Sequence, residues 1–413
     1  MTFASLGLLP VLARALDERR YLEPTPVQAA AIPPALSGAD VLAQAQTGSG
    51  KTAAFVLPVL QALLKGQRHK PRRVHALILV PTRELAAQVG DTVRGLAQFA
   101  AEPLKVAVLF GGVSINPQMM GLRGGADVVV ATPGRLLDLI EHNALRLDQV
   151  STLVLDEADR LLDLGFADEL ARVLGELPAR RQNLFFSATF PPAVQALANQ
   201  LLRDPVRVEV DAAFDEPPQI HQYAIQVDAG QRTQLLRHLI QDQAWGRVLV
   251  FVATKYATEH VAEKLCRAGL RAAAFHGELS QGARTQVLAD FKASRLQVVV
   301  ATDVAARGID VARLPAVVNY DLPRSAVDYV HRIGRTGRAG EVGAAVSFIS
   351  TDTDEAHFRL IEKRQGQRIE REQIAGFEPV EVPVPKVDPN GGVKGKRPSK
   401  KDKLRAAAAR GGA

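Results

Sequence analysis

The sequence predicts an α/β protein of two tandem domains, each a parallel sheet covered by helices on both faces, followed by a disordered basic tail. Short runs of β-branched and aliphatic residues alternate with helix-like segments along most of the chain. These runs are almost continuously apolar, as is typical of parallel strands buried on both faces. Residues 211–218, with two prolines and several acids, interrupt the alternation and predict a linker between the domains.

The strand-like runs fall into two series. In the first half of the chain we expect strands at residues 40–43, 74–80, 105–110, 127–131, 152–155 and 184–187. In the second half we expect them at residues 248–252, 271–275, 297–301, 316–320 and 344–349. The predicted organisation is a first domain at 1–210, a linker at 211–220, a second domain at 221–375 and a tail at 376–413. Because ligands of open parallel sheets bind at the carboxyl ends of strands, polar motifs directly after these runs are the candidate sites.

Composition narrows the class of protein. The chain has 413 residues, of which 47% are hydrophobic and 23% charged, as expected of a soluble globular protein. Its single cysteine, Cys266, excludes an intramolecular disulfide and fits a reducing compartment. No run of eighteen or more apolar residues and no signal-like N-terminal segment occurs, so we expect a cytoplasmic protein with no membrane partner.

The net charge of +7 is concentrated in the tail. Residues 386–413 carry nine Lys and Arg against two Asp, so the preceding residues are formally neutral. With almost no large apolar side chains, this segment cannot bury enough surface to offset its ordering entropy, and it is expected to be disordered. Such tails typically contact nucleic-acid phosphates without regard to sequence, although a purely solubilising role is the alternative.

The segment after the first predicted strand has the character of a phosphate-binding loop. It runs Gln44-Ala45-Gln46-Thr47-Gly48-Ser49-Gly50-Lys51-Thr52. The two glycines let the backbone wrap around an anion, Lys51 can reach the β- and γ-phosphates, and the Thr52 hydroxyl can bind Mg²⁺. Ala45 stands where the general pattern has its first glycine.

A second motif closes the predicted strand at residues 152–155. It reads Asp156-Glu157-Ala158-Asp159 and resembles a Walker B element, in which the first acid holds Mg²⁺ and the second polarises water. An acidic quartet alone is more often a solvated helix start. Following a phosphate loop and preceding two arginine-rich motifs, it indicates ATP hydrolysis.

These two motifs resemble those of the DEAD-box family of ATP-dependent RNA helicases, whose two domains are RecA-like. The other motifs of the family occur in order: Pro24-Thr25-Pro26-Val27-Gln28 with Phe3 upstream, Pro81-Thr82-Arg83-Glu84-Leu85, Gly111-Gly112, Thr132-Pro133-Gly134-Arg135, Ser187-Ala188-Thr189, Val250-Phe251-Val252, His276-Gly277, Gln281 with Arg284, Thr302-Asp303, Arg307-Gly308-Ile309-Asp310 and the run from His331 to Arg338. The resemblance covers about residues 3–375. Arg20 departs from it, because a glycine commonly precedes the aromatic Tyr21. The segment 359–379 further resembles the bacterial RhlE subgroup.

The resemblance implies ATP and Mg²⁺ as cofactors. The implied ATP-binding residues are Phe3, Tyr21, Gln28, Thr47, Gly48, Ser49, Gly50, Lys51, Thr52, Gly308 and Asp310, with Thr52 and Asp156 as metal ligands. The implied catalytic residues are Lys51, Asp156, Glu157 and two arginine fingers, Arg335 and Arg338. The amide of Gln28 both donates and accepts, which suits the N6 and N7 edge of adenine. Because the phosphate loop and the fingers lie on different domains, we expect hydrolysis only when the domains close.

RNA is the expected partner, held through its backbone across both domains. The implied contacts are Pro81, Thr82, Arg83, Gly112, Thr132, Pro133, Gly134, Arg135, Arg284, Thr302 and Asp303. Hydroxyl, amide and guanidinium groups suit phosphates, and an acid suits a 2′-hydroxyl. Ser187, Thr189 and His331 are the candidates for coupling the two sites. The expected role is local separation of short duplexes, with ribosomal precursors or RNA-decay machinery as the cellular context.

Two other function classes share parts of this sequence pattern. A DNA-directed helicase of the same superfamily would share the phosphate loop and the acids but is expected to lack the Pro-Thr-Pro-Val-Gln element and the Ser-Ala-Thr motif in this form. A non-enzymatic RNA chaperone acting through the tail would survive loss of Glu157, whereas a helicase would not. Since every catalytic position is filled, the RNA helicase is favoured.

Overall fold

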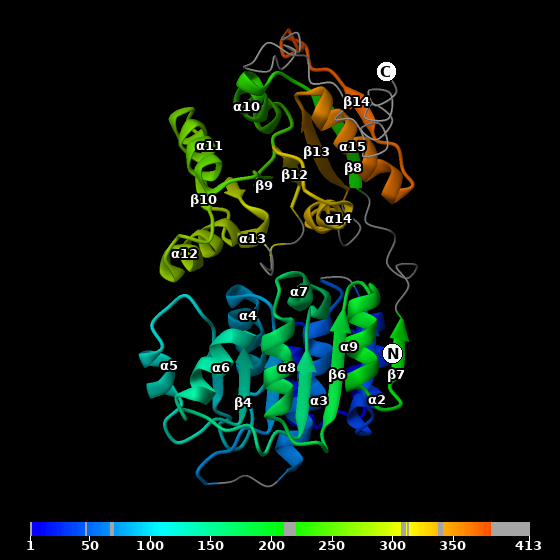
Figure 1. Ribbon diagram of the computed structural model, residues 1–413, viewed down its shortest axis with the longest axis vertical. Coiled ribbons are helices and arrows are strands. Elements are labelled where there is room, and N and C mark those ends of the chain that lie inside the picture. The colour runs from blue at the N-terminus through cyan, green and yellow to red at the C-terminus, as the bar shows by residue number, and fades with distance from the viewer. Residues whose placement is uncertain are drawn as a thin grey trace, which may run out of the picture.

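A computed structural model shows two parallel sheets of seven strands each, flanked by helices (Figure 1). It describes residues 2–45, 48–66, 70–209, 220–306, 311, 314–337 and 342–380. The two sheets with their helices confirm the predicted pair of tandem RecA-like domains. The predicted linker, apart from Ile220, and the tail beyond residue 380 lie outside the described residues. Within the described residues, no helix is long and apolar enough to cross a membrane.

The first sheet has the strand order β3-β4-β2-β5-β6-β1-β7 and all its pairings are parallel. Its strands are β1 (Val41–Gln44), β2 (Ala76–Leu79), β3 (Val106–Leu109), β4 (Val128–Ala131), β5 (Thr152–Leu155), β6 (Gln182–Ser187) and β7 (Val206–Glu209). The helices are η1 (Phe3–Leu6), α1 (Pro10–Glu18), α2 (Pro26–Leu36), α3 (Lys51–Lys65), α4 (Arg83–Leu96), α5 (Asn116–Gly121), α6 (Pro133–Glu141), α7 (Ala158–Asp163), α8 (Ala167–Gly175) and α9 (Pro192–Leu201).

The second sheet has the order β10-β11-β9-β12-β13-β8-β14, also parallel throughout. Its strands are β8 (Ile220–Gln226), β9 (Val248–Phe251), β10 (Ala272–Phe275), β11 (Val298–Ala301), β12 (Ala316–Asn319), β13 (Gly343–Ile349) and β14 (Glu370–Glu372). The helices are η2 (Ala229–Gln231), α10 (Arg232–Asp242), α11 (Lys255–Arg267), α12 (Gln281–Lys292), α13 (Asp303–Ala306), α14 (Ala326–Ile333) and α15 (Asp352–Gln365). Strand for strand, this order repeats that of the first sheet, so the two domains share one topology.

Each predicted strand forms, and three strands were not predicted. Strands β7 and β14 are edge strands. Only Val208 of β7 is buried, and β14 has the sequence Glu-Arg-Glu. An edge strand has a partner on one side only, so polar side chains are tolerated there. Strand β8 has the mixed sequence Ile-His-Gln-Tyr-Ala-Ile-Gln between β13 and β14. Continuous apolar runs predicted the other strands, including the edge strands β3 and β10, and these three were missed because their own sequences are polar or mixed.

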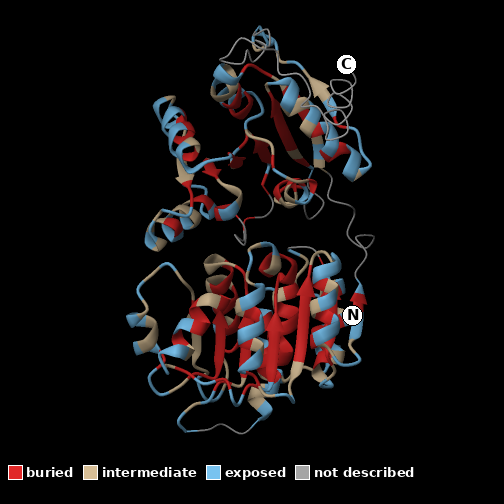
Figure 2. Ribbon diagram, viewed as in Figure 1, coloured by how far each residue is buried: buried red, intermediate tan, exposed pale blue. Residues whose placement is uncertain are grey.

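Both faces of the first sheet are buried, as the apolar runs predicted (Figure 2). Successive residues of β2 point to opposite faces, so Ile78 packs in one apolar cluster while Leu77 and Leu79 pack in another. Figure 1 shows β4 and β6 with their arrowheads toward the second domain. The carboxyl ends of the first sheet therefore face the seam between the domains, where the sequence motifs gather.

The backbone conformation at position 20 accounts for the glycine that commonly precedes the aromatic residue in this motif. Arg20 has a φ of 58°, in the left-handed region, at an exposed turn just after α1. A residue with a Cβ is disfavoured there by about 1–2 kcal/mol, whereas glycine adopts the conformation freely.

We therefore expect Arg20→Gly to raise the free energy of unfolding of the first domain by about 1 kcal/mol, the relief of strain being partly offset by added freedom in the unfolded chain. Chemical denaturation of the full chain, followed through its first transition, measures this. Glu18→Gly, an exposed substitution inside α1, is the control and should destabilise by about 0.5–1 kcal/mol. Equal destabilisation by both variants would contradict the account.

Candidate active site at the domain seam

The phosphate loop lies between β1 and the N-terminus of α3. Gly48 and Gly50 have φ values of 83° and 93°, in the left-handed region. A Cβ on Gly50 would come within 2.5 Å of the Gln28 side-chain nitrogen, so only glycine fits there. Ser49 also lies in this loop, whereas Thr47 falls outside the described residues. The loop thus presents backbone amides at a helix N-terminus, an arrangement that binds anions.

Gln28 ties helix α2 to this loop. It is almost fully buried, accepts a hydrogen bond from the Thr25 amide at 3.0 Å and donates one to the Gly50 carbonyl at 3.0 Å. Each half of the amide makes one of these bonds, so a second N–H donor and a second oxygen lone pair remain for an adenine edge. Phe3 is buried in the apolar cluster above the sheet, and Tyr21 packs half-buried against the same cluster.

Lys51 and Asp156 form the charged centre of the site. Both are buried, and the Lys51 ammonium donates to the Ala45 carbonyl at 2.7 Å. Burial raises the pKa of Asp156 to about 7, against the opposing effect of the nearby Lys51 charge. An ammonium has three donors, so Lys51 retains capacity for phosphate oxygens.

The oxygen ligands present fit Mg²⁺ bound together with a nucleotide. Thr52 is the second residue of α3, half-buried, and Asp156 directly follows β5. No group of three or more His, Cys, Asp or Glu that could hold a metal occurs within the described ranges. In nucleotide sites Mg²⁺ is usually bound by one or two protein oxygen ligands, and phosphate oxygens and water complete its coordination.

Glu157 has a strained backbone. Its φ of 51° lies in the left-handed region, and its amide donates to the Asp156 carboxylate at 3.0 Å. A residue with a side chain is held in this conformation only where the surroundings impose it, and such positions cluster at functional sites. The turn sets the direction of the Glu157 carboxylate independently of that of Asp156.

Asp159 joins the acidic turn to the segment after β6. Its carboxylate accepts hydrogen bonds from the Thr189 amide at 3.0 Å and the Thr189 hydroxyl at 2.8 Å. Ser187 completes the network, because its hydroxyl donates to the Thr189 carbonyl at 2.8 Å and accepts from the Asp159 amide at 3.2 Å. The two coupling candidates of the first domain are thus bonded to an acid to which the sequence had assigned no role.

Arg160, next to Asp159, contacts the second domain. The buried guanidinium of Arg160 pairs with Asp328, on α14 of the second domain, at 3.4 Å. His331 lies one turn further along α14, where burial first, and then the charge of Arg160, lower its pKa to about 4. His331 is therefore neutral at pH 7. Arg335 follows the end of α14 and lowers the same pKa further, which places it near His331.

The candidate RNA contacts of the first domain sit at the carboxyl ends of β2, β3 and β4. The Arg83 guanidinium lies against Gly112, where a Cβ would come within 2.4 Å of it. Thr82 is the N-cap of α4 and accepts from the Leu85 amide at 3.2 Å. These groups share one edge of the sheet with Pro81.

The Thr132-Pro133-Gly134-Arg135 motif begins α6 at that same edge. Thr132 is the N-cap of α6 and is buried. Arg135 is also buried, and its guanidinium donates to the Val113 carbonyl at 2.7 Å. Arg135 therefore supports the loop after β3 rather than projecting from it.

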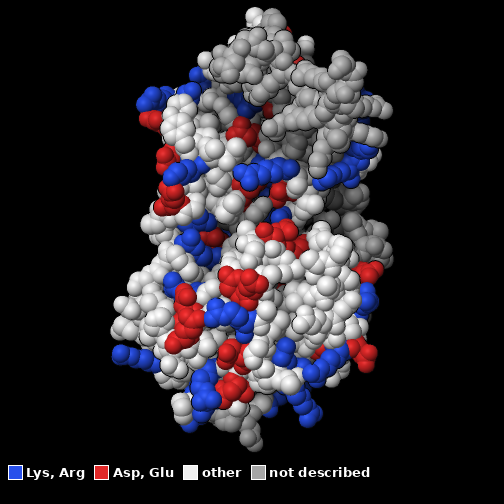
Figure 3. Space-filling view, in the orientation of Figure 1, with Lys and Arg blue, Asp and Glu red and all other residues white. Residues whose placement is uncertain are grey.

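Arg284 forms a second ion pair between the domains. Its guanidinium pairs with Glu84 of α4 at 2.7 Å, and both side chains are less than a tenth exposed. It also donates to the His276 and Ala305 carbonyls and lies over the Phe275 ring at 4.5 Å. The sequence analysis assigned Arg284 to RNA and gave Glu84 no role; the structure makes them a buried ion pair across the seam. Figure 3 shows charges of both signs along this seam.

Asp303 is also committed to an arginine. Its carboxylate receives two bonds from the Arg332 guanidinium, at 2.6 and 2.7 Å. Arg332 is buried, donates to Asn319 at 2.9 Å and lies over the Phe251 ring at 4.8 Å. Thr302, just before Asp303, is half-buried. Gly308, Asp310 and Arg338 lie outside the described residues.

If the Glu84–Arg284 pair stabilises the closed arrangement of the domains, removing it should weaken closure. We expect Glu84→Gln to raise the RNA concentration for half-maximal ATPase about tenfold with little change in the rate at saturation, because loss of a buried charge-assisted bond costs about 1–3 kcal/mol. The control is Glu278→Gln, which removes an exposed pair with Lys255 and should change little. A Glu84→Gln enzyme with unaltered RNA dependence would exclude a role in closure.

Comparison with known proteins identifies the family. A model of the DEAD/DEAH box helicases matches residues 25–197, and one of the helicase conserved C-terminal domain matches residues 231–340. The RNA helicase SrmB of Escherichia coli is 44% identical over 89% of this chain and 82% of its own length. DeaD of Mycobacterium tuberculosis is 43% identical over 92% of this chain and 66% of its own.

Solved structures also match this chain. Dbp5 of Saccharomyces cerevisiae, bound to RNA and ADP BeF3, aligns with a TM-score of 0.79 and 32% identity over 90% of this chain and 95% of its own. A DEAD box protein from Methanococcus jannaschii aligns over 90% of this chain and 99% of its own, with 36% identity but a TM-score of only 0.53. The chain belongs to the DEAD-box family of ATP-dependent RNA helicases.

Proposed function

We propose that ATP is hydrolysed at the seam and that the contacts through Asp159 and Arg160 couple hydrolysis to RNA binding. Asp159 bonds to Thr189 on one side, and Arg160 pairs with Asp328 of the other domain. Both residues belong to the turn that holds Asp156 and Glu157. Any movement of the second domain is therefore transmitted to the catalytic carboxylates through two consecutive residues, and this contact chain is the observation that carries the proposal.

The proposed roles follow from the chemistry of each side chain. Lys51 binds phosphate oxygens, while Thr52 and Asp156 hold Mg²⁺. Glu157 accepts a proton from the attacking water. Mg²⁺ held there would neutralise part of the charge on the phosphates. Arg335 adds positive charge from the second domain. The remaining nucleotide residues, Thr47, Gly308, Asp310 and Arg338, keep the roles implied by the resemblance.

RNA binding is proposed along the carboxyl edge of both sheets. Thr82, Arg83, Gly112 and Thr302 are the direct contacts we propose, through hydroxyl, guanidinium and backbone groups that suit phosphates. Arg135, Arg284 and Asp303 support that track from beneath, since each guanidinium or carboxylate is already bonded to protein. The RNA and ADP BeF3 seen with Dbp5 support the placement of both ligands by analogy.

We further infer a place within the family and the cell. The segment 359–379 favours the RhlE subgroup, and we propose action on ribosomal precursors or in RNA decay, in the cytoplasm. The proposed functional units are residues 1–210 and 221–375, with the basic tail as a sequence-independent RNA tether.

Glu157→Gln tests the catalytic assignment. It should retain ATP binding, because Lys51 and Asp156 remain, and should lower the RNA-stimulated rate about 10²–10⁴-fold through loss of the general base. Nucleotide binding and steady-state hydrolysis are measured on the same preparation. A rate within tenfold of wild type would show that Glu157 is not the base, and duplex separation surviving without hydrolysis would favour an RNA chaperone.

Deletion of residues 386–413 tests the tail. The ATPase rate at saturating RNA should be nearly unchanged, while RNA affinity weakens most at low salt. Every ion pair between the tail and an RNA phosphate that the deletion removes should make the slope of log affinity against log salt shallower by about 0.7 on single strands. RNA affinity of the full chain and of the deletion variant is measured across a salt series. Identical slopes for the two proteins would show that the tail is only a solubilising extension.

A further inference from the structure

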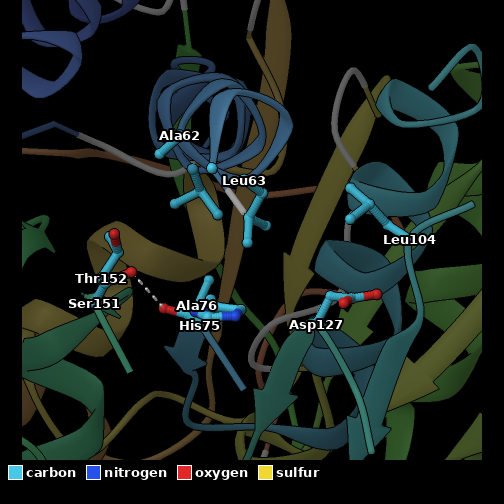
Figure 4. Close-up of a pocket in the computed structure, with 10 residues that line it drawn as sticks. Ala62, Leu63, His75, Ala76, Leu104, Asp127, Ser151 and Thr152 are labelled. Atoms are coloured by element: carbon cyan, nitrogen blue, oxygen red, sulfur yellow. Dashed lines mark hydrogen bonds between the residues drawn. The ribbon is translucent and has the colours of Figure 1, made fainter. Parts of the chain in front are cut away.

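A pocket opens at the amino end of the first sheet, opposite the phosphate loop. It has a volume of about 260 Å³. Figure 4 shows Leu63 of α3 and Leu104, which precedes β3, facing a space above His75 and Asp127. Thr152 also lines it and begins β5, whose other end leads into Asp156. At about 3.3 Å per residue, roughly 13 Å of strand separate the pocket from the catalytic acid.

The one carboxylate in the wall is neutralised by its neighbours. The Asp127 side chain is only 5% exposed and pairs with the Arg72 guanidinium at 3.1 Å. It also accepts from the Lys105 amide at 2.7 Å. The pocket therefore presents apolar side chains such as Leu63 and Leu104 beside the uncharged polar groups of Ser151 and Thr152, with little net negative charge to repel an anion.

Basic residues adjacent to the lining residues form a basic rim. Lys65 precedes Gly66, Arg73 lies two residues before His75, and the Arg123 carbonyl accepts from the Lys105 side chain, next to Leu104. Lys65, Lys70, Arg73 and Arg123 are exposed, and no carboxylate of the described residues pairs with any of them. Arg72 remains 40% exposed at its side chain despite the pair with Asp127. Glu102 is the exposed acid of the adjoining loop. Figure 3 shows Lys and Arg gathered, with some acids among them, around the end of the first domain remote from the seam.

We propose that this pocket and its rim form a second RNA-binding surface, in which the pocket takes one unpaired base and the rim takes the neighbouring phosphates. The volume lies just below the range of about 300–1,000 Å³ usual for drug-sized ligands, so it suits a single ring system. Apolar walls suit the flat faces of any base, and exposed Lys and Arg side chains suit its backbone.

The occupant is a flanking segment of the RNA held at the seam. The inference rests on the proposed function in that RNA is the ligand. A strand bound at the carboxyl edge places its own extensions near the amino edge at high effective concentration, which a separate acidic protein does not enjoy. Contacts on both edges would anchor a structured RNA while only its central strand is remodelled.

The test compares a short single strand that fills only the seam with the same strand extended at both ends. In wild type, extension should tighten binding, and Lys70→Glu with Arg73→Glu should remove most of that gain. The salt slope for the extended strand should fall by about 1.4, because two ion pairs with phosphates are removed. Ala62→Trp, an exposed substitution that fills the pocket, should weaken binding of the extended strand about five- to tenfold, as expected when one base can no longer stack.

The matched control is Arg237→Glu with Lys264→Glu, which makes the same change in net charge at exposed sites of α10 and α11. All variants should keep wild-type binding of the short strand and wild-type ATPase at saturating RNA. Thiouridine placed in the extension should crosslink to the peptides containing Leu104 or His75 in wild type and not in Ala62→Trp.

Three results would overturn the inference. The first is an equal loss of affinity in the test and control pairs, and the second is crosslinking confined to the seam. The third is that polyglutamate binds wild type but not the Lys70→Glu, Arg73→Glu double variant, while extended RNA binds both proteins equally. That result would assign the surface to an acidic protein. Loss of RNA stimulation with the short strand in wild type would instead refute the proposed function, so the two failures are distinguishable.

Discussion

Buried guanidinium groups have to be paired, and this requirement organises the seam between the two domains. Arg160 and Arg284 lie in different domains, and each reaches across to a carboxylate of the other domain. A buried charge left without its partner is destabilising by several kcal/mol. Arg160 also pairs with Asp163 of its own domain at 3.5 Å, and Arg284 also donates to the His276 and Ala305 carbonyls of its own domain. Closure therefore adds a carboxylate of the other domain to each guanidinium.

The two pairs lie at different functional places along the seam. Glu84 follows the Pro-Thr-Arg motif on the candidate RNA track, whereas Arg160 follows the acidic turn of the candidate nucleotide site. Contacts on the RNA side and contacts on the nucleotide side thus stabilise one and the same arrangement of the domains. Two ligands that favour the same arrangement promote each other's binding, so this arrangement would let RNA and ATP strengthen each other's binding.

The parallel sheet gives the first domain two unlike ends. At its carboxyl edge, the strands lead into glycines, acids and hydroxyls that are tied to the seam. At its amino edge, the strands begin beside an apolar pocket with a basic rim. Strand β5 spans both, from Thr152 to the residue before Asp156. The carboxyl edge therefore holds the groups that contact the second domain. The pocket at the amino edge is built from residues of the first domain alone.

The sequence alone determined the fold class, the central strands and the positions of the motifs. Continuous apolar runs follow directly from burial of both faces, and short motifs such as the phosphate loop carry their chemistry in adjacent residues. Strands β7, β8 and β14 were missed because their sequences are polar or mixed rather than continuously apolar. The tertiary structure alone decided the partners of long side chains: Arg284 with Glu84, Asp303 with Arg332 and Gln28 with Gly50. Those bonds depend on the direction and distance of groups far apart in the chain, and linear spacing contains no information about either.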